Sequence, residues 1–231
     1  MSRTFAATCA PWVNILLMLS TWKVAGHLMA LVTTLTGLGY LVIRSALPCA
    51  SAEVKFFFSL PIGYVVSSSL IALSAKVGGT AYLSTLSIVV VGAVGAGLLA
   101  RAYIEREQKA EVQGGVGVSM LSTIVCIVYF TPSVVSDAVH LPDGGYQWMY
   151  VDTQYFMAIA ASVKSGLGSV RMPGMFHGEL NYHFGPYALA GGWSALTGVE
   201  LADSVARVTR GSAQLSLVLS AVGLGTIVGR K

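Results

Sequence analysis

Long stretches of apolar residues alternate with short polar connections along most of the chain. A helix that crosses a bilayer needs about 20 mostly apolar residues. The apolar stretches therefore predict about seven transmembrane helices, at residues 6–22, 24–43, 56–75, 82–100, 116–135, 185–202 and 211–229. We expect an all-α fold, a polytopic integral membrane helical bundle formed by a single transmembrane domain over residues 1–231. The stretch at 6–22 is short and the one at 185–202 is rich in Gly and Ala, so an interfacial or re-entrant segment is the alternative for each.

Small residues recur at four-residue spacing inside several of these stretches. Lipid tails offer no hydrophobic driving force between helices, so spanning helices pack through close approach of their backbones. The pairs Gly92 with Ala96, Ala93 with Gly97, and Gly225 with Gly229 have the spacing that such contacts use. We expect them at helix contacts.

The polar residues gather in one segment, 137–184, between the fifth and sixth predicted spans. It holds three of the four Asp and three of the four His of the chain. A plain connection between two spans needs far fewer residues. This long loop is therefore the predicted location of any chemistry.

Composition supports a membrane protein and excludes several other classes. Hydrophobic residues make up 55% of the chain and charged residues 10%, against roughly 25% charged in soluble domains. The net charge of +4 is scattered, so we expect membrane lipid rather than nucleic acid as a partner. The three cysteines lie far apart with no CxxC pair, which predicts neither a zinc ribbon nor a disulfide framework.

The basic residues predict an orientation, because Lys and Arg near helix ends stay on the cytoplasmic side. The densest cluster is RAYIEREQKAE at 101–111. A cytoplasmic N-terminus puts this cluster in the cytoplasm, together with Arg207 and Arg210. The loop 137–184 is then extracytoplasmic.

The segment VDTQYFMAIAASVKSG within the loop predicts one helix. Asp152 suits the N-cap, Lys164 the last turn and Gly166 the stop. Apolar residues share one face, so we expect the helix to lie flat on the membrane. Asp152 has two interpretations: a cap for the first-turn N–H groups, or a carboxylate at the mouth of a cavity that acts as general base.

An H-x-E-x3-H run comes next, formed by His177, Glu179 and His183. These residue types bind a divalent metal ion or exchange protons, but the spacing is not that of the HExxH zinc motif. Hydrogen bonding at the membrane interface is the alternative for all three. Arg171 and Lys164 suit an anionic phosphate beside the bilayer, since the Arg fork matches phosphate oxygens. Ordinary solvated cations are the alternative for these two.

The loop and the apolar stretch after it resemble the multi-spanning GT-C class of glycosyltransferases. The resemblance covers residues 145–205 and rests on an Asp that opens an interfacial helix, the run LNYHFG at 180–185, and the Gly/Ala-rich stretch ending in LTG at 196–198. It implies transfer of a sugar from a polyprenyl-phosphate donor on the extracytoplasmic side. Asp152 would be the catalytic carboxylate, and His183 would line the same cavity. Enzymes of that class are longer, so the chain would be the N-terminal part of one.

These observations predict a glycosyltransferase with Asp152 as general base and a substrate site formed by His183, Glu179, Arg171, Lys164 and Tyr182. A divalent metal ion is a candidate cofactor, with His177, Glu179 and His183 as its candidate ligands. The rival prediction is a noncatalytic subunit of a membrane complex, or part of a transporter, that uses the loop as a docking surface. The predicted spans carry almost no ionisable residues, which disfavours an ion-coupled transporter.

Overall fold

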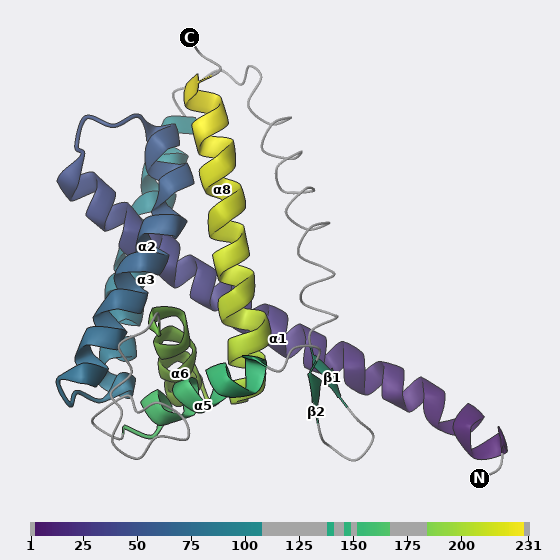
Figure 1. Cartoon of the computed structure of the whole chain (residues 1–231). Helices are drawn as coiled ribbons and strands as arrows, with labels where there is room; N and C mark the ends of the chain where they lie inside the picture. The colour runs from purple at the N-terminus through teal and green to yellow at the C-terminus, as the bar shows by residue number, and fades with distance from the viewer. Residues whose placement is uncertain (1–2, 108–137, 141–145, 149–151, 167–183, 229–231) are drawn as a thin grey trace.

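The computed structural model describes residues 3–107, 138–140, 146–148, 152–166 and 184–228 (Figure 1). The predicted fifth span and most of the loop 137–184 lie outside these residues. The described part is mainly helical, and two short strands, β1 (Ala138–His140) and β2 (Tyr146–Trp148), pair antiparallel. Its helices are α1 (Arg3–Ala46), α2 (Ala52–Lys76), α3 (Ala81–Glu107), α5 (Asp152–Lys164), α6 (Gly185–Thr197), α7 (Leu201–Asp203), the π-helix η1 (Ser204–Thr209) and α8 (Arg210–Val228).

Three helices in the described part are long and apolar enough to cross a membrane. They contain the segments Trp22–Ala46, Val54–Lys76 and Ala81–Glu105, which match the predicted spans 24–43, 56–75 and 82–100. This identifies the chain as a membrane protein. The count of seven spans is not confirmed, and whether α8, which covers nearly all of 211–229, crosses the membrane stays a prediction.

One continuous helix, α1, replaces the two spans predicted at 6–22 and 24–43. The physical reason lies in the residues between them. Reversal of a helix needs turn-forming residues such as Gly, Pro, Asn or Asp, and Trp22 and Lys23 offer none, so the helix continues through them. With Trp22–Ala46 as a single span, Lys23 and Arg44 lie at opposite ends of it.

The contacts among α1, α2 and α3 are made by backbone against backbone. A Cβ added at Gly37 of α1 would overlap the backbone of Gly92 and Ala96 in α3. The predicted contact through Gly92 and Ala96 is therefore confirmed. Gly97 and Gly225 have nothing within 4 Å of such a Cβ, so the other two predicted small-residue pairs make no helix contact at these glycines.

A second close contact joins α1 to α2. A Cβ on Gly39 would overlap Ser59 and Gly63, and one on Gly63 would overlap Leu35. Residues near 35 in α1 thus meet residues near 63 in α2, and residues near 39 meet those near 59, which makes the two helices antiparallel. The three helices form an up-down-up unit with short turns at 47–51 and 77–80.

The predicted sixth span, 185–202, is wrong as a membrane-crossing helix. Helix α6 has 13 residues, about 20 Å at 1.5 Å per residue, which is short of the roughly 30 Å hydrocarbon core. It ends at Gly198, whose φ of 72° lies in the left-handed region. The chain then reverses and continues through α7 and η1 into α8.

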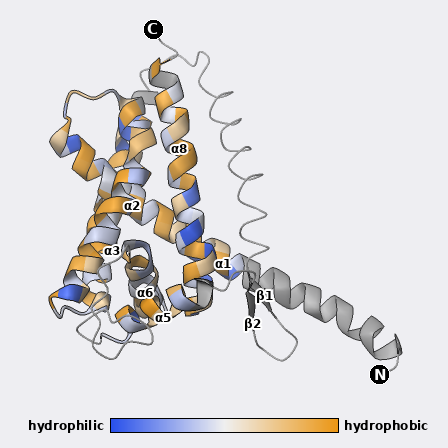
Figure 2. Cartoon of the chain, viewed as in Figure 1, coloured by the Kyte–Doolittle hydropathy of each residue, from blue (hydrophilic) through white to orange (hydrophobic). Residues whose placement is uncertain are grey.

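Helix α8 runs antiparallel to α2 and closes the bundle on that side (Figure 1). Gly211 at its start packs on Leu28 of α1, and Gly223 packs on Phe57 and Phe58 of α2. Figure 2 shows the long helices mainly in apolar colours, with hydrophilic residues where α8 begins. Because Gly211 contacts Leu28, close to Lys23 in α1, the start of α8 lies at the end of the bundle that holds Lys23, α5 and α6.

Candidate functional site

Asp152, the predicted general base, is the first residue of helix α5. The helix ends at Lys164, and Gly166 follows in the left-handed conformation with a φ of 68°. The N–H of Gly166 donates to the carbonyl of Val163 at 3.2 Å, which closes the last turn. A helix thus occupies the range that the sequence predicts, from its Asp start to its Gly stop.

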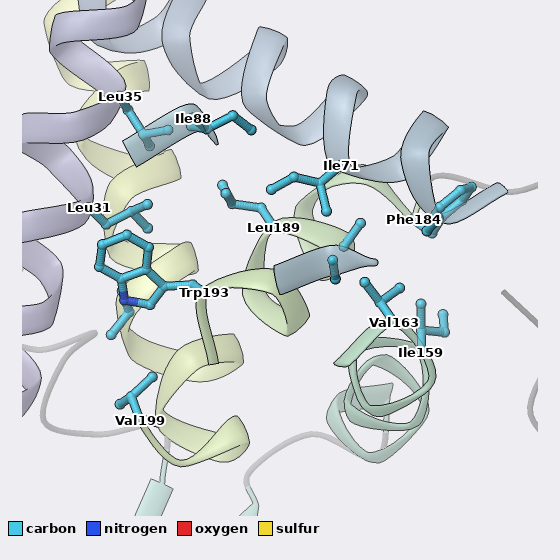
Figure 3. Close-up of a cluster of buried hydrophobic side chains, with 14 of the residues drawn as sticks. Leu31, Leu35, Ile71, Ile88, Ile159, Val163, Phe184, Leu189, Trp193 and Val199 are labelled. Atoms are coloured by element: carbon cyan, nitrogen blue, oxygen red, sulfur yellow. The ribbon is translucent and has the colours of Figure 1, made fainter. Parts of the chain in front are cut away.

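The apolar face of α5 packs against protein. Ile159 and Val163 are buried, at 2% and 3% exposure, in one cluster with Leu189 of α6 (Figure 3). A Cβ on Gly191 of α6 would overlap the carbonyl of Ala160, so the two helices touch along their backbones. This face therefore meets α6, and the prediction that α5 lies in the membrane plane remains a prediction.

Aromatic rings join the first half of α5 to the start of α6. The rings of Phe156 and Tyr187 are stacked, with centroids 4.2 Å apart and planes 7° from parallel. Tyr155 meets Phe156 edge to face, with centroids 5.8 Å apart. All three are half-buried and pack on the main cluster.

Helix α6 packs against α2 and α3 at the end of the bundle where α5 lies. Its residues Ala188–Ser194 are buried. Gly192 faces Thr85 of α3 and Ile71 of α2, and the ammonium of Lys76 lies 5.5 Å from the ring centroid of Phe184. Trp193 belongs to the same buried cluster as Leu31 of α1 (Figure 3).

A buried ion pair that the sequence analysis missed lies in the turn from α6 to α8. The Arg207 guanidinium Nη1 is 3.2 Å from the Asp203 carboxylate Oδ1, and the two side chains are 5% and 10% exposed. Arg207 belongs to the π-helix η1. In the sequence analysis, Arg207 is used only to predict the orientation and is placed on the cytoplasmic side, opposite the loop 137–184. The signal for the pair was its i, i+4 spacing inside an apolar run.

Two serine hydrogen bonds lock this turn. The Ser204 hydroxyl donates to the Ala190 carbonyl of α6 at 2.7 Å, and the Ser194 hydroxyl donates to the Val199 carbonyl at 2.7 Å. Both serines are buried. These bonds satisfy polar groups that would otherwise be costly in an apolar surrounding.

The structure separates two of the predicted site residues and does not describe the others. Asp152 and Lys164 are the first and last residues of α5, about 18 Å apart along the axis at 1.5 Å per residue. Lys164 is exposed. Over the described ranges, no group of His, Cys, Asp and Glu side chains could hold a metal ion. The remaining predicted positions lie outside the described residues: Arg171, His177, Glu179, Tyr182 and His183.

Comparisons with protein-family models, with curated proteins and with solved structures found no match to this chain. The site's own geometry is therefore the ground for a functional interpretation.

Proposed function

We propose that this chain is a membrane glycosyltransferase, or the N-terminal part of one, that transfers a sugar from a polyprenyl-phosphate donor on the extracytoplasmic side. The observation that carries the proposal is the attachment of α5. Its first residue is the proposed general base, Asp152, and its apolar face is anchored on α6 through Ile159 and Val163. A positioned base needs such a rigid support, because proton transfer requires hydrogen-bond contact with the acceptor.

The other proposed roles match those expected from the sequence. His183, Glu179 and Tyr182 contact the acceptor, and a divalent metal ion bound by His177, Glu179 and His183 would help to hold the donor phosphate. Arg171 also binds this phosphate. Lys164, at the far end of α5, is then a contact for the outer part of the donor rather than for the reacting atoms.

We also propose an orientation, with the α5–α6 end of the bundle extracytoplasmic. Arg44 and Lys55 lie at the other end, where α3 ends within the dense basic run 101–111, and we assign this end to the cytoplasm because of that run. Lys23, Lys76 and Arg210 lie at the α5–α6 end. Because α1 is continuous, the N-terminus then shares the extracytoplasmic side with α5, in place of the predicted cytoplasmic side. A cysteine at Gly78 should react with an impermeant thiol reagent added outside, and the natural Cys49 should not. Reversed labelling would place the proposed site in the cytoplasm and contradict the donor assignment.

The test of the function separates catalysis from helix capping at Asp152. Asn and Ser are good caps but poor bases. Asp152→Asn and Asp152→Ser should leave insertion and folding unchanged, yet lower sugar transfer by about 100-fold or more, the contribution of a positioned base. If the residue is only a cap, both variants should transfer sugar like the parent, and Asp152→Ala should lower the free energy of unfolding by about 1 kcal/mol. Full activity of Asp152→Asn would remove the catalytic role.

The second candidate is a noncatalytic subunit of a membrane complex, or part of a transporter, and the exposed side of α3 favours it. Leu83, Val90 and Val94 are each more than half exposed along this helix. Such a face suits a partner helix as well as lipid. Absence of transfer by the verified full-length parent, together with co-purification of a membrane partner, would support this candidate.

A further inference from the structure

We propose that the Phe156–Tyr187 stack is a positioning contact, which fixes the first turn of α5, and with it Asp152, relative to the start of α6. The inference rests on the proposed function, in which Asp152 is the base. The two rings are 4.2 Å apart and nearly parallel. They join two helices that are separated in the sequence by residues 165–184.

Helical spacing places the stack beside the candidate base. Residues four apart lie on the same face of a helix, so position 156 follows position 152 by one turn on one face of α5. Tyr187 lies in the first turn of α6, two residues after the run LNYHFG at 180–185. The stack is thus next to the first turns of both helices.

The first turn of α5 depends on such a contact. The first N–H groups of a helix have no partner within the helix, and helix ends fray. The buried anchors of α5, Ile159 and Val163, belong to its second half. Its first half is held by Tyr155 and Phe156, which pack on the main cluster, and by Met157, which packs with Phe156 on the smaller cluster around Ala160.

Helix α6 is a fixed reference for this contact. Its buried stretch Ala188–Ser194 lies against α2 and α3, and the Ser204 hydroxyl bonds its Ala190 carbonyl. A ring stacked on Tyr187 is therefore held relative to the whole bundle. Stacked aromatic pairs also have a preferred geometry, which an aliphatic contact of similar area lacks.

The test compares the variants Phe156→Leu and Tyr187→Leu with two controls in the full chain. Tyr187→Phe keeps the stack, and Val163→Ala weakens the α5–α6 contact at its far end. Each protein is reconstituted in lipid vesicles and assayed for transfer from a panel of radiolabelled polyprenyl-phosphate hexoses. Backbone hydrogen–deuterium exchange of α5 is measured on the same samples.

Both Leu variants should lower kcat by about 10- to 100-fold, the cost of a reacting group misplaced by about 1 Å, with KM little changed. Their amides at 153–158 should exchange faster than in the parent. Tyr187→Phe, which keeps the ring stack and removes only the hydroxyl, should lower kcat and speed exchange far less than Tyr187→Leu. Val163→Ala should speed exchange only near the end of α5 and should lower kcat less than the Leu variants do, because Val163 anchors the end of α5 that is far from Asp152.

Three results would overturn the proposal: unchanged kcat in the Leu variants, a loss that lies in KM alone, or equal exchange at 153–158 in every variant. If the parent itself transfers no sugar, the proposed function fails, and the exchange data alone decide the stack. Faster exchange at 153–158 in the Leu variants then supports the positioning contact, and unchanged exchange refutes it.

Discussion

The two halves of this bundle are held together by different means. Helices α1, α2 and α3 meet through glycines, such as Gly37 on Gly92 and Gly39 on Ser59, where backbones touch. The α5–α6–η1 end has one such backbone contact, Gly191 on Ala160, and is otherwise held by a ring stack, a buried ion pair and serine hydrogen bonds. Backbone contacts tolerate no added atom, whereas side-chain contacts can be exchanged one at a time. The first half is thus a rigid frame, and the second is the part that substitutions can adjust.

The largest expected effect is at the α1–α3 glycine contact. Gly37→Leu would drive a side chain into the backbone of Gly92, which neither helix can relieve without moving apart. We expect loss of folded, monodisperse protein in detergent size-exclusion chromatography, beyond the roughly 1–3 kcal/mol of ordinary overpacking.

The matched control for Gly37→Leu is Gly97→Leu on α3, because Gly97 is exposed and has nothing within 4 Å of an added Cβ. This variant should fold like the parent. Equal behaviour of the two variants would show that backbone contact does not hold the frame.

A smaller effect is expected at the buried ion pair. Asp203→Leu leaves the Arg207 charge buried beside an apolar residue, and breaking such a pair costs about 3–5 kcal/mol. The double variant Asp203→Leu with Arg207→Leu should recover most of this loss, because no charge is left buried. Denaturant unfolding in detergent measures both.

The exposed pair of Arg101 and Glu105, 2.7 Å apart on α3, is the control for the buried pair. Glu105→Ala should not change unfolding measurably, since exposed pairs contribute little. If Asp203→Leu is equally harmless, the buried pair does not hold the turn between α6 and α8.

The smallest expected effect is at the serine bonds. Ser204→Ala removes the hydroxyl that bonds the Ala190 carbonyl and should lower the free energy of unfolding by about 1 kcal/mol. Ser87→Ala is the control, because the Ser87 hydroxyl is exposed and bonds only its own helix. A loss in the control as large as that in Ser204→Ala would contradict this ranking.

Helix positions were more predictable from the sequence than helix ends and reversals. Apolar length alone located the spans at 24–43, 56–75 and 82–100, because burial in lipid acts on every residue of a span. The continuity of α1 depends on a missing turn at Trp22 and Lys23, and the shortness of α6 depends on one left-handed glycine, Gly198. Such local features are weak signals within long apolar stretches.

The candidate site was predictable only where it obeys local helix rules. Lys164 and Gly166 mark the end of α5 as predicted, whereas Asp152 is its first residue rather than the N-cap that precedes it. The contact of its apolar face with α6 was not predictable, because an amphipathic face fits a protein partner as well as a membrane surface. The Asp203–Arg207 pair was missed because hydropathy averages over a window and hides two charges that neutralise each other.

The shortness of α6 constrains how the chain can be assembled in the membrane. A helix of 13 residues is too short to be inserted as an independent span, and its stretch Ala188–Ser194 is buried against the other helices. Its place between α2 and α3 exists only once those two helices are in the bilayer. Because they precede α6 in the chain, synthesis from the N-terminus delivers them first. We therefore expect α6 to enter late, as a segment folded into a preformed groove rather than threaded across the lipid.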